Sequence, residues 1–181
     1  ARTPFDSQTP SVPAPASQPV QTGIDVLAST GFAALKGLKV GLVTNHTGLA
    51  ADGQSTIDLM WKAGSGANAT FTLAALFSPE HGIRGILDAN VPAERDTATG
   101  LTIHSLYGDT QRPTAAMLNG LDAIVVDLQD IGARYYTYMT TMAYVLEEAA
   151  PRKLKVFVLD RPNPIGGVAI DGPGLDATAT S

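Results

Sequence analysis

Apolar residues recur along this chain in two alternating patterns. Short runs rich in β-branched residues alternate with segments whose apolar residues recur every three or four positions, which is the spacing of one helix face. The short runs predict strands over 39–44, 71–77, 123–128 and 155–160, with a further edge strand over 102–106. The helical spacing predicts a broken helix over 24–35, a helix opened by the capping box Ser55–Asp58, and a helix over 139–150. This alternation is typical of an α/β fold with an open, doubly wound, mainly parallel sheet and helices on both faces.

Three of these predictions concern position as well as type. Pro113 is expected in the first turn of a short helix that Gly120 ends. The run 155–160 is expected to be the final central strand. In the last helix, one apolar stripe is expected to face the core, and it consists of Met139, Met142, Leu146 and Ala150.

The first 22 residues differ from the rest, because Pro, Ser, Gln and Thr dominate them and large apolar side chains are almost absent. This composition predicts a disordered tether ahead of one domain over 23–181. Such tethers are common in exported bacterial proteins, where they follow a removed signal or a lipid anchor. We therefore expect a periplasmic or extracellular protein, and a disordered end of any other protein is the plain alternative. No apolar run approaches the roughly 20 residues of a membrane span.

Composition removes several classes of function. Seventeen acidic and 12 basic residues give a formal charge of −5, and no basic cluster is visible along the sequence, which argues against nucleic acid or anionic lipid as a partner. The absence of cysteine excludes a disulfide scaffold, a thiolate zinc site and a Cys nucleophile. The dinucleotide, P-loop, zincin and lipase motifs are also missing from the sequence.

Polar residues and Gly or Pro follow the predicted strands at their carboxyl ends, where open α/β sheets bind ligands. These segments are Asn45–Gly48, Ser78–Gly82, Gln129–Gly132 and Arg161–Pro164, with Asp127 and Asp160 at or near strand ends. The loops at the opposite edge of the predicted sheet carry no comparable pattern. This asymmetry places a candidate site at the carboxyl edge.

Within this set, Glu80 is the strongest candidate for a general acid, because a rigid turn after Pro79 can hold its carboxyl group partly desolvated. A surface Glu on an ordinary turn is the alternative. Asp127, Gln129 and Asp130 could supply a second carboxylate, a base or a ligand-binding amide, or could instead cap the following helix.

The arginines and tyrosines near these loops suggest ligand contacts. Arg84, Arg134 and Arg161 suit a carboxylate or phosphate on a ligand, although each could instead neutralise a neighbouring Asp. Of Tyr135, Tyr136 and Tyr138, one is expected to contact a sugar ring or apolar group while the others pack. His46 and His81 could hold a metal with Glu80, Asp127 or Asp130, but their spacing gives little support to this.

Four longer motifs together resemble the exo-β-N-acetylmuramidase (NamZ-type) family, formerly a bacterial domain of unknown function. They are GLVTNHTG over 41–48, SPEHGIRG over 78–85, DLQDIGARYYTY over 127–138 and LDRPNP over 159–164. The resemblance extends from about Gly23 to the end of the chain. The stretch 87–100 departs from the family pattern, which is richer in Gly there. This departure leaves the substrate preference open.

The resemblance implies an exo-acting glycoside hydrolase that releases terminal β-N-acetylmuramic acid from peptidoglycan fragments during cell-wall turnover and recycling. It implies no metal or organic cofactor. Family members pair a Rossmann-like N-terminal domain, which this chain resembles, with a C-terminal α/β domain, and the active site is thought to lie between the two. The missing C-terminal domain is therefore an expected partner, and this fragment alone is expected to be inactive or weakly active.

Glycosidases need an acid and a second group, which is a base, a nucleophile or a substrate-positioning residue. For the acid we choose Glu80. For the second group we choose Asp127 or Asp130, with Asp160 behind them. The expected substrate-binding residues are Asn45, His46, His81, Arg84, Gln129, Arg134, Tyr138, Asp160, Arg161 and Asn163. A metal-dependent hydrolase of phosphates or amides and a non-catalytic peptidoglycan-binding module are the alternative functions.

Overall fold

The computed structural model describes residues 20–79, 82–83, 94–108, 110–174, 176 and 178. The predicted tether lies almost entirely outside the described residues. The helices are α1 (Gly23–Ser29), α2 (Thr56–Ala63), α3 (Ala115–Leu118) and α4 (Tyr138–Ala149), with 3₁₀ turns η1 (Ala33–Leu35) and η2 (Ala150–Arg152). The strands are β1 (Lys39–Thr44), β2 (Thr72–Ser78), β3 (Glu94–Arg95), β4 (Thr102–Ser105), β5 (Ala123–Asp127) and β6 (Lys155–Val158).

The strands form one sheet in the order β3-β4-β2-β1-β5-β6. Five of them are parallel, and only the two-residue β3 pairs antiparallel, with β4. From β1 the chain builds the sheet outward through β2 and β4, and it then returns to the other side of β1 with β5 and β6. This reversal is the topology of a Rossmann-like fold, and it confirms the fold class that the sequence predicted.

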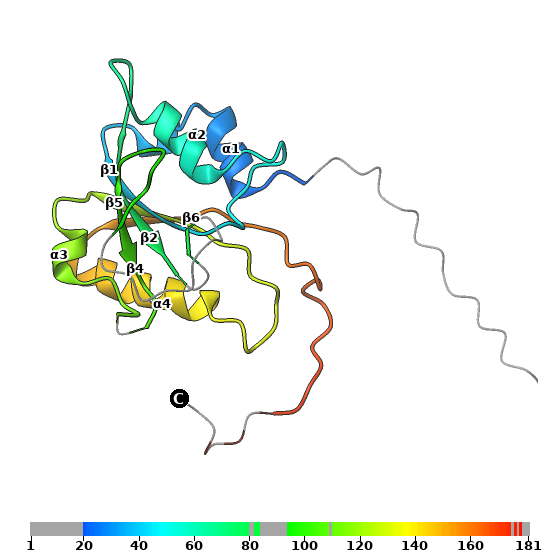
Figure 1. The fold of residues 1–181 in the computed structure, drawn as a ribbon. Coiled ribbons are helices and arrows are strands. Elements are labelled where there is room, and N and C mark those ends of the chain that lie inside the picture. Colours follow the sequence, from blue (N-terminus) through cyan, green and yellow to red (C-terminus); the bar gives the residue numbers. More distant parts are fainter. Residues whose placement is uncertain are drawn as a thin grey trace, which may run out of the picture.

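Helices cover both faces of the sheet (Figure 1), with an apolar cluster on each face. On one face, α1 and α2 bury Ile24, Ile57 and Met60 against β1 and β2. On the other face, Leu118 of α3 and Val145 of α4 pack against side chains of β1, β2 and β5. None of the helices in the described ranges is long and apolar enough to cross a membrane.

Local sequence accounts well for the first half of the fold. The broken helix is α1 followed by η1, and the apolar residues whose spacing predicts it are all buried: Ile24, Leu27, Phe32 and Leu35. The Ser55 hydroxyl accepts the backbone N–H of Asp58 at 3.0 Å, so Ser55 is the N-cap of α2 as predicted.

Three positional predictions were wrong. The buried face of α4 is Tyr138, Thr141, Val145 and Ala149, one residue before the predicted stripe, because apolar residues surround much of this helix and the local pattern does not select one face. The strand β6 lies at an edge of the sheet and not in its centre, because in the described sheet it pairs with β5 on one side and with no strand on the other. Pro113 precedes the N-cap Thr114 of α3, because the Thr114 hydroxyl accepts the N–H of Met117 and so starts the helix.

The helix α4 provides a direct test of this packing. Val145 is fully buried and Leu146 is 43% exposed. We expect Val145→Ala to lower the free energy of unfolding by about 1–3 kcal/mol, and Leu146→Ala by less than about 1 kcal/mol, because only the first leaves a cavity. Urea denaturation of the two variants measures both values, and a larger loss in Leu146→Ala would contradict the assigned face.

Candidate functional site

The candidate site lies where the topology reverses, between the carboxyl ends of β1 and β5. Thr44 at the end of β1 is aligned with Asp127 at the end of β5. The Thr44 hydroxyl donates to the backbone carbonyl of Asp127 at 2.9 Å, which ties the two strand ends together. The connections that follow these strands leave in opposite directions, and in open α/β sheets this is the place where ligands bind.

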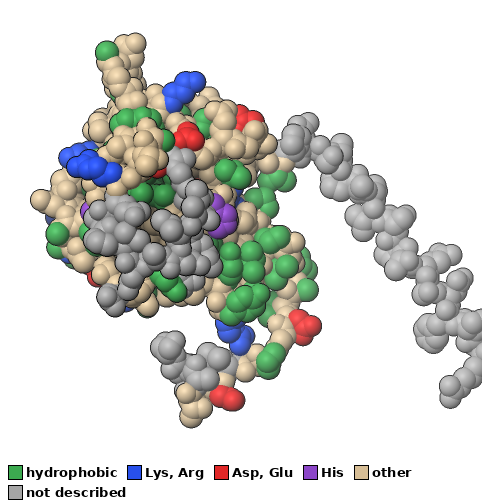
Figure 2. Space-filling view, viewed as in Figure 1, with side chains coloured by type: hydrophobic (Ala, Val, Ile, Leu, Met, Phe, Trp, Pro, Cys, Tyr) green, Lys and Arg blue, Asp and Glu red, His purple; other side chains and the backbone are tan. Residues whose placement is uncertain are grey.

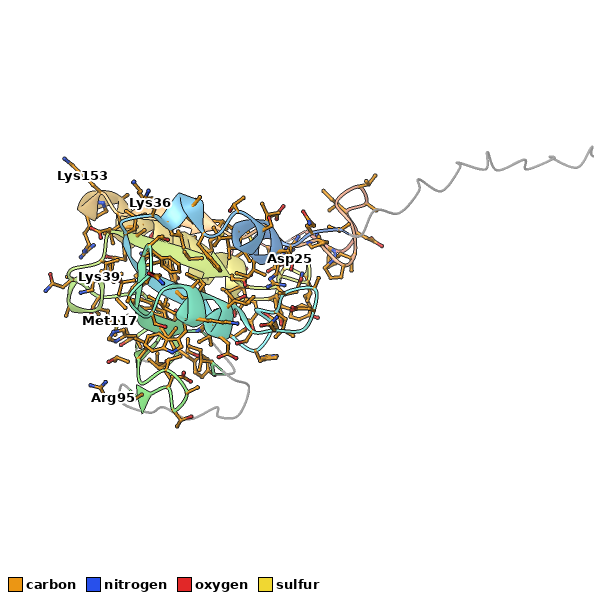
Figure 3. The ribbon with its side chains drawn as sticks, turned by 90° about the horizontal axis from the view of Figure 1, so that it is seen from above. Asp25, Lys36, Lys39, Arg95, Met117 and Lys153 are labelled. Atoms are coloured by element: carbon orange, nitrogen blue, oxygen red, sulfur yellow. The ribbon has the colours of Figure 1, made fainter. Side chains whose placement is uncertain are left out.

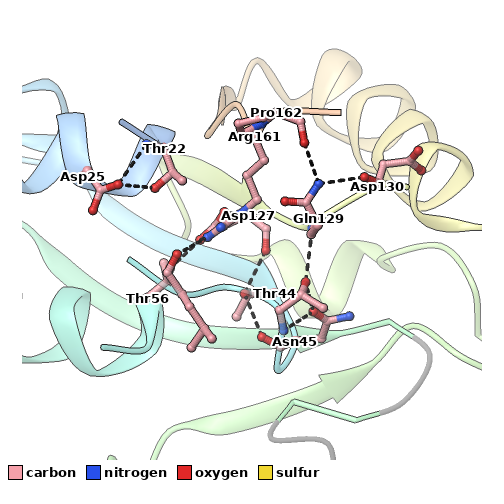
Figure 4. A network of polar contacts seen from close by, with 12 residues as sticks. Thr22, Asp25, Thr44, Asn45, Thr56, Asp127, Gln129, Asp130, Arg161 and Pro162 are labelled. Carbon is pink, nitrogen blue, oxygen red and sulfur yellow. Dashed lines mark hydrogen bonds and ion pairs between the residues drawn. The ribbon is translucent and has the colours of Figure 1, made fainter. Parts of the chain in front are cut away.

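The Asp127–Arg161 ion pair is at the centre of this edge (Figure 4). Arg161 donates from Nε to Oδ1 of Asp127 at 2.6 Å and from Nη2 to Oδ2 at 2.9 Å. The Asp127 side chain is fully buried and that of Arg161 is 7% exposed. The hydroxyl of Thr56, at the start of α2, also donates to Oδ2 of Asp127. Both Asp127 oxygens are thus occupied by donors.

Arg161 also connects the loop after β6 with the loop after β1. Its Nη2 donates to the backbone carbonyl of Leu49 at 2.9 Å. Its positive charge acts on the carboxylate of Asp25 in α1 as well. One guanidinium therefore joins three parts of the chain by direct contacts: the segment after β6, the end of β5 and the loop after β1.

A second group of hydrogen bonds joins the loops after β1 and β5. The Asn45 side chain is buried and donates to the hydroxyl of Tyr138 at 2.5 Å, while its Oδ1 accepts from the Thr47 hydroxyl at 2.6 Å. The backbone N–H of Gln129 donates to the Thr47 hydroxyl at 3.2 Å. The Gln129 side-chain amide donates to the carbonyls of Asp130 and Pro162, at 2.7 and 2.9 Å.

Asp130 differs from Asp127 in its surroundings. Its Oδ1 accepts the backbone N–H of Gly132 at 2.7 Å, but its buried Oδ2 has no hydrogen-bond partner in the structure. A buried side-chain oxygen without a hydrogen-bond partner is unusual in a folded protein.

The loop that carries Asp130 packs tightly against the segment after β6. Gly132 has a φ of +75°, and a Cβ at this position would lie 2.6 Å from the Asn163 side-chain oxygen. Only glycine satisfies both conditions. Asn163 in turn accepts the N–H of Ile165 at 3.1 Å.

The structure thus brings seven of the predicted site residues into adjoining contacts: Asn45, Asp127, Gln129, Asp130, Tyr138, Arg161 and Asn163. His46 and Asp160 have exposed side chains at the same edge, and Arg134 is exposed and donates to the carbonyl of Pro173 at 3.1 Å. Glu80, His81 and Arg84 lie outside the described residues, as does part of the 87–100 stretch. The roles assigned to all of them stay predictions.

Sequence reasoning missed Thr56 and the carbonyl of Leu49, and it included Thr47 only as part of the segment Asn45–Gly48 without a role. Thr56 follows the Ser55 cap, so its position at the start of a helix at the carboxyl edge was visible, but nothing local predicts its bond to a residue 71 positions away. No group of three His, Asp or Glu side chains placed to hold a metal occurs among the described residues.

The fold and the site define an open α/β domain with a carboxylate-, amide- and arginine-containing site at its topological switch point. The family model described as "Exo-beta-N-acetylmuramidase NamZ, N-terminal" matches residues 40–181. The chain belongs to this family.

The comparisons also identify similar proteins. Over 159 residues the chain is 44% identical to the peptidoglycan β-N-acetylmuramidase NamZ of Bacillus subtilis, covering 87% of this chain and 37% of that protein. A Bacteroides fragilis DUF1343 protein, solved at 1.65 Å, aligns with a TM-score of 0.77 and 44% identity over 87% of this chain and 38% of its own. A second B. fragilis protein of that family aligns with a TM-score of 0.72 and 34% identity over 91% and 40%. The chain thus spans about two fifths of the length of these relatives.

The buried ion pair predicts a large effect of removing one partner. Arg161→Gln leaves the carboxylate of Asp127 buried without its counter-charge, so we expect the free energy of unfolding to fall by about 3–5 kcal/mol. Arg134→Gln, an exposed charge loss at the same edge, should cost less than about 0.5 kcal/mol. Urea titrations of both variants, of Asp127→Asn and of Asp127→Asn/Arg161→Gln test this. The double variant should be more stable than the summed losses of Asp127→Asn and Arg161→Gln predict.

Asp25 predicts a pH effect on stability. The backbone N–H of Ala51 and the hydroxyl of Thr22 donate to its carboxylate, at 2.9 and 2.7 Å, and they lower the pKa of Asp25 below its ordinary 3.8. A lowered folded-state pKa stabilises the fold above the unfolded-state pKa, and this contribution is lost as the pH falls through the folded value. The stability difference between the unmodified chain and Asp25→Asn should therefore be full near pH 6 and shrink below about pH 4. A pH-independent difference would contradict it.

Proposed function

We propose that this chain forms one half of an exo-acting glycoside hydrolase that releases terminal β-N-acetylmuramic acid from peptidoglycan fragments. Family membership and the 44% identity to a peptidoglycan β-N-acetylmuramidase support the reaction. The observation in the fold that carries the proposal is the unpartnered, buried Oδ2 of Asp130 at the switch point.

Asp130 and Glu80 are the proposed pair of reacting groups. Asp127 was the other candidate for the second group, but both of its oxygens are engaged by Arg161 and Thr56, so its proposed role is to position Arg161. The free oxygen of Asp130 can accept a proton from water or from a substrate acetamido group without first breaking a bond within the protein. Glu80, which lies in the family motif over 78–85, is the proposed acid for the leaving oxygen.

Arginine is the proposed ligand for the lactyl carboxylate of muramic acid. In the described chain, Arg134 is the exposed arginine at the carboxyl edge, and its one hydrogen bond goes to the Pro173 carbonyl. Its guanidinium group can therefore reorient to bind a carboxylate with the loss of that one hydrogen bond. Two nitrogens of Arg161 already donate to Asp127, so this arginine is less suited to the role. Arg84 remains a second candidate.

The remainder of a family-length protein is the proposed partner on this side of the domain. Large apolar side chains are exposed here, where the segment after β6 and the loop before α4 run together (Figure 2). They include Tyr135 at 80%, Ile165 at 66%, Val168 at 100% and Ile170 at 97% exposure. Apolar residues gathered in this way mark an interaction surface. A second domain packed here would close the site from this side.

The proposed setting is the bacterial cell wall, with an exported protein, periplasmic or extracellular, that takes part in wall turnover and recycling. The tether-like composition of residues 1–22 supports export, and a lipid anchor through it is part of the proposal. No cofactor is proposed.

Hydrolysis of a chromogenic N-acetylmuramic acid β-glycoside tests the proposal, with the N-acetylglucosamine glycoside as the control substrate. The assay compares this chain with a protein of family length. We expect muramic-specific release, lowered about 100-fold or more by Glu80→Gln and Asp130→Asn but not by Asp52→Asn, whose carboxylate is exposed and bonds only to Gln54. Arg134→Gln should raise KM more than it lowers kcat.

Other outcomes would identify another function. Saccharide binding without any release would favour a non-catalytic peptidoglycan-binding module. Release from phosphate or amide substrates that a chelator abolishes would favour a metal-dependent hydrolase.

A further inference from the structure

All five lysines of the chain lie at the amino edge of the sheet, opposite the candidate site. They are Lys36, Lys39, Lys62, Lys153 and Lys155. Lys39 and Lys155 begin β1 and β6, Lys36 and Lys153 lie just before these strands, and Lys62 is in the last turn of α2. Figure 3 shows Lys36, Lys39 and Lys153 at the end of the molecule away from Asp25. The sequence gives no hint of this cluster, because 119 positions separate Lys36 from Lys155.

These lysines are exposed, and none of them takes part in an ion pair within the described residues. The ion pairs found there are made by Arg112, Arg152 and Arg161 instead. The strands β1 and β6 lie on either side of β5. The beginnings of these two strands, at Lys39 and Lys155, are therefore two strand spacings apart, or about 10 Å. In a chain with a net charge of −5, this is a localised positive surface.

Acidic groups at this edge offset the lysine charges only in part. Asp122 lies just before β5, between Lys39 and Lys155, and its Oδ2 accepts the backbone N–H of Lys39 at 2.8 Å. Glu148 is paired with Arg152 at 3.1 Å. Helix-dipole stabilisation accounts for Lys62 at the end of α2, but it does not account for lysines that begin strands.

A cleft of about 750 Å³ opens at the same edge, lined by Lys39, Trp61, Gly64, Phe71, Thr72 and Asp122 among others. Trp61, the only tryptophan of the chain, is half-buried, and its ring packs partly against the core beside α2. The cleft thus combines Trp61 and Phe71 with backbone polar groups, while the Lys39 ammonium group lies at the same edge on the α3 side, 3.8 Å from where a Cβ of Gly120 would be. Aromatic residues suit a sugar ring, and lysines spread along the edge suit anionic substituents further along a polymer.

We propose that the amino edge is an accessory binding site for an anionic polysaccharide, with a sugar unit in the Trp61 cleft and carboxylates along the lysines. The choice of a saccharide rests on the proposed function, whereas the charge complementarity rests on the lysines alone. Such a site would hold the protein on a polymer while the opposite edge acts on chain ends, because the two surfaces lie at opposite ends of parallel strands.

Binding of polygalacturonate, a carboxylated sugar polymer, tests the inference with the 181-residue chain. The fluorescence of Trp61 reports occupancy of the cleft. We expect binding that weakens as NaCl rises from 25 to 300 mM, a shift in Trp61 emission, and no binding of neutral dextran. Lys36→Gln/Lys39→Gln/Lys155→Gln should weaken binding about tenfold, and the same three positions changed to Arg should retain it.

Matched variants and competing polymers make the outcome decisive. Lys39→Gln should weaken binding more than Arg112→Gln, since the Arg112 charge is already paired with Glu147. Unchanged affinity in the triple Gln variant would overturn the inference. So would equal binding of RNA or polyglutamate without a change in Trp61 emission, because the site would then be a general polyanion surface. The assay measures no hydrolysis, so it succeeds or fails independently of the glycosidase activity.

Discussion

The buried ion pair between Asp127 and Arg161 is the constraint on which the carboxyl edge depends. Removing two charges from water costs several kcal/mol per ion, and only good geometry with further hydrogen bonds offsets that cost. Here the geometry is bidentate, and Thr56 and the carbonyl of Leu49 complete it. These contacts form only when four segments are in place at once: the end of β5, the start of α2 and the loops after β1 and β6. This arrangement positions the loops that carry Asp130, Gln129 and Asn45.

The parallel sheet also divides the chemistry of the molecule between its two edges. Every strand of the parallel set begins at one edge and ends at the other, so residues far apart in sequence gather according to their place in a strand. Carboxylates, amides and Arg161 collect where strands end, and the lysines collect where β1 and β6 begin. The net charge of −5 conceals this division.

The sequence predicted the fold class and the strands because β-branched apolar runs have few alternatives in a buried sheet. It failed for the face of α4, because apolar residues surround that helix, and for the edge position of β6, because strand order is not a local property. At the site, the carboxyl-edge rule selected residues that the fold does bring together. It could offer Arg161 only as a ligand contact or as the partner of some Asp, since 34 residues separate it from Asp127.

The exposed position of β6 has a consequence for how the chain behaves among its own copies. An outermost strand presents a row of unpaired backbone groups that can template another strand, and Val158 of β6 is 52% exposed. Lys153 and Lys155 stand at the beginning of that strand, and charged side chains at an edge oppose pairing between identical molecules. In the part of the chain that the structure describes, the edge strand β6 therefore begins beside two positive charges, which disfavours its pairing with the same strand of another copy.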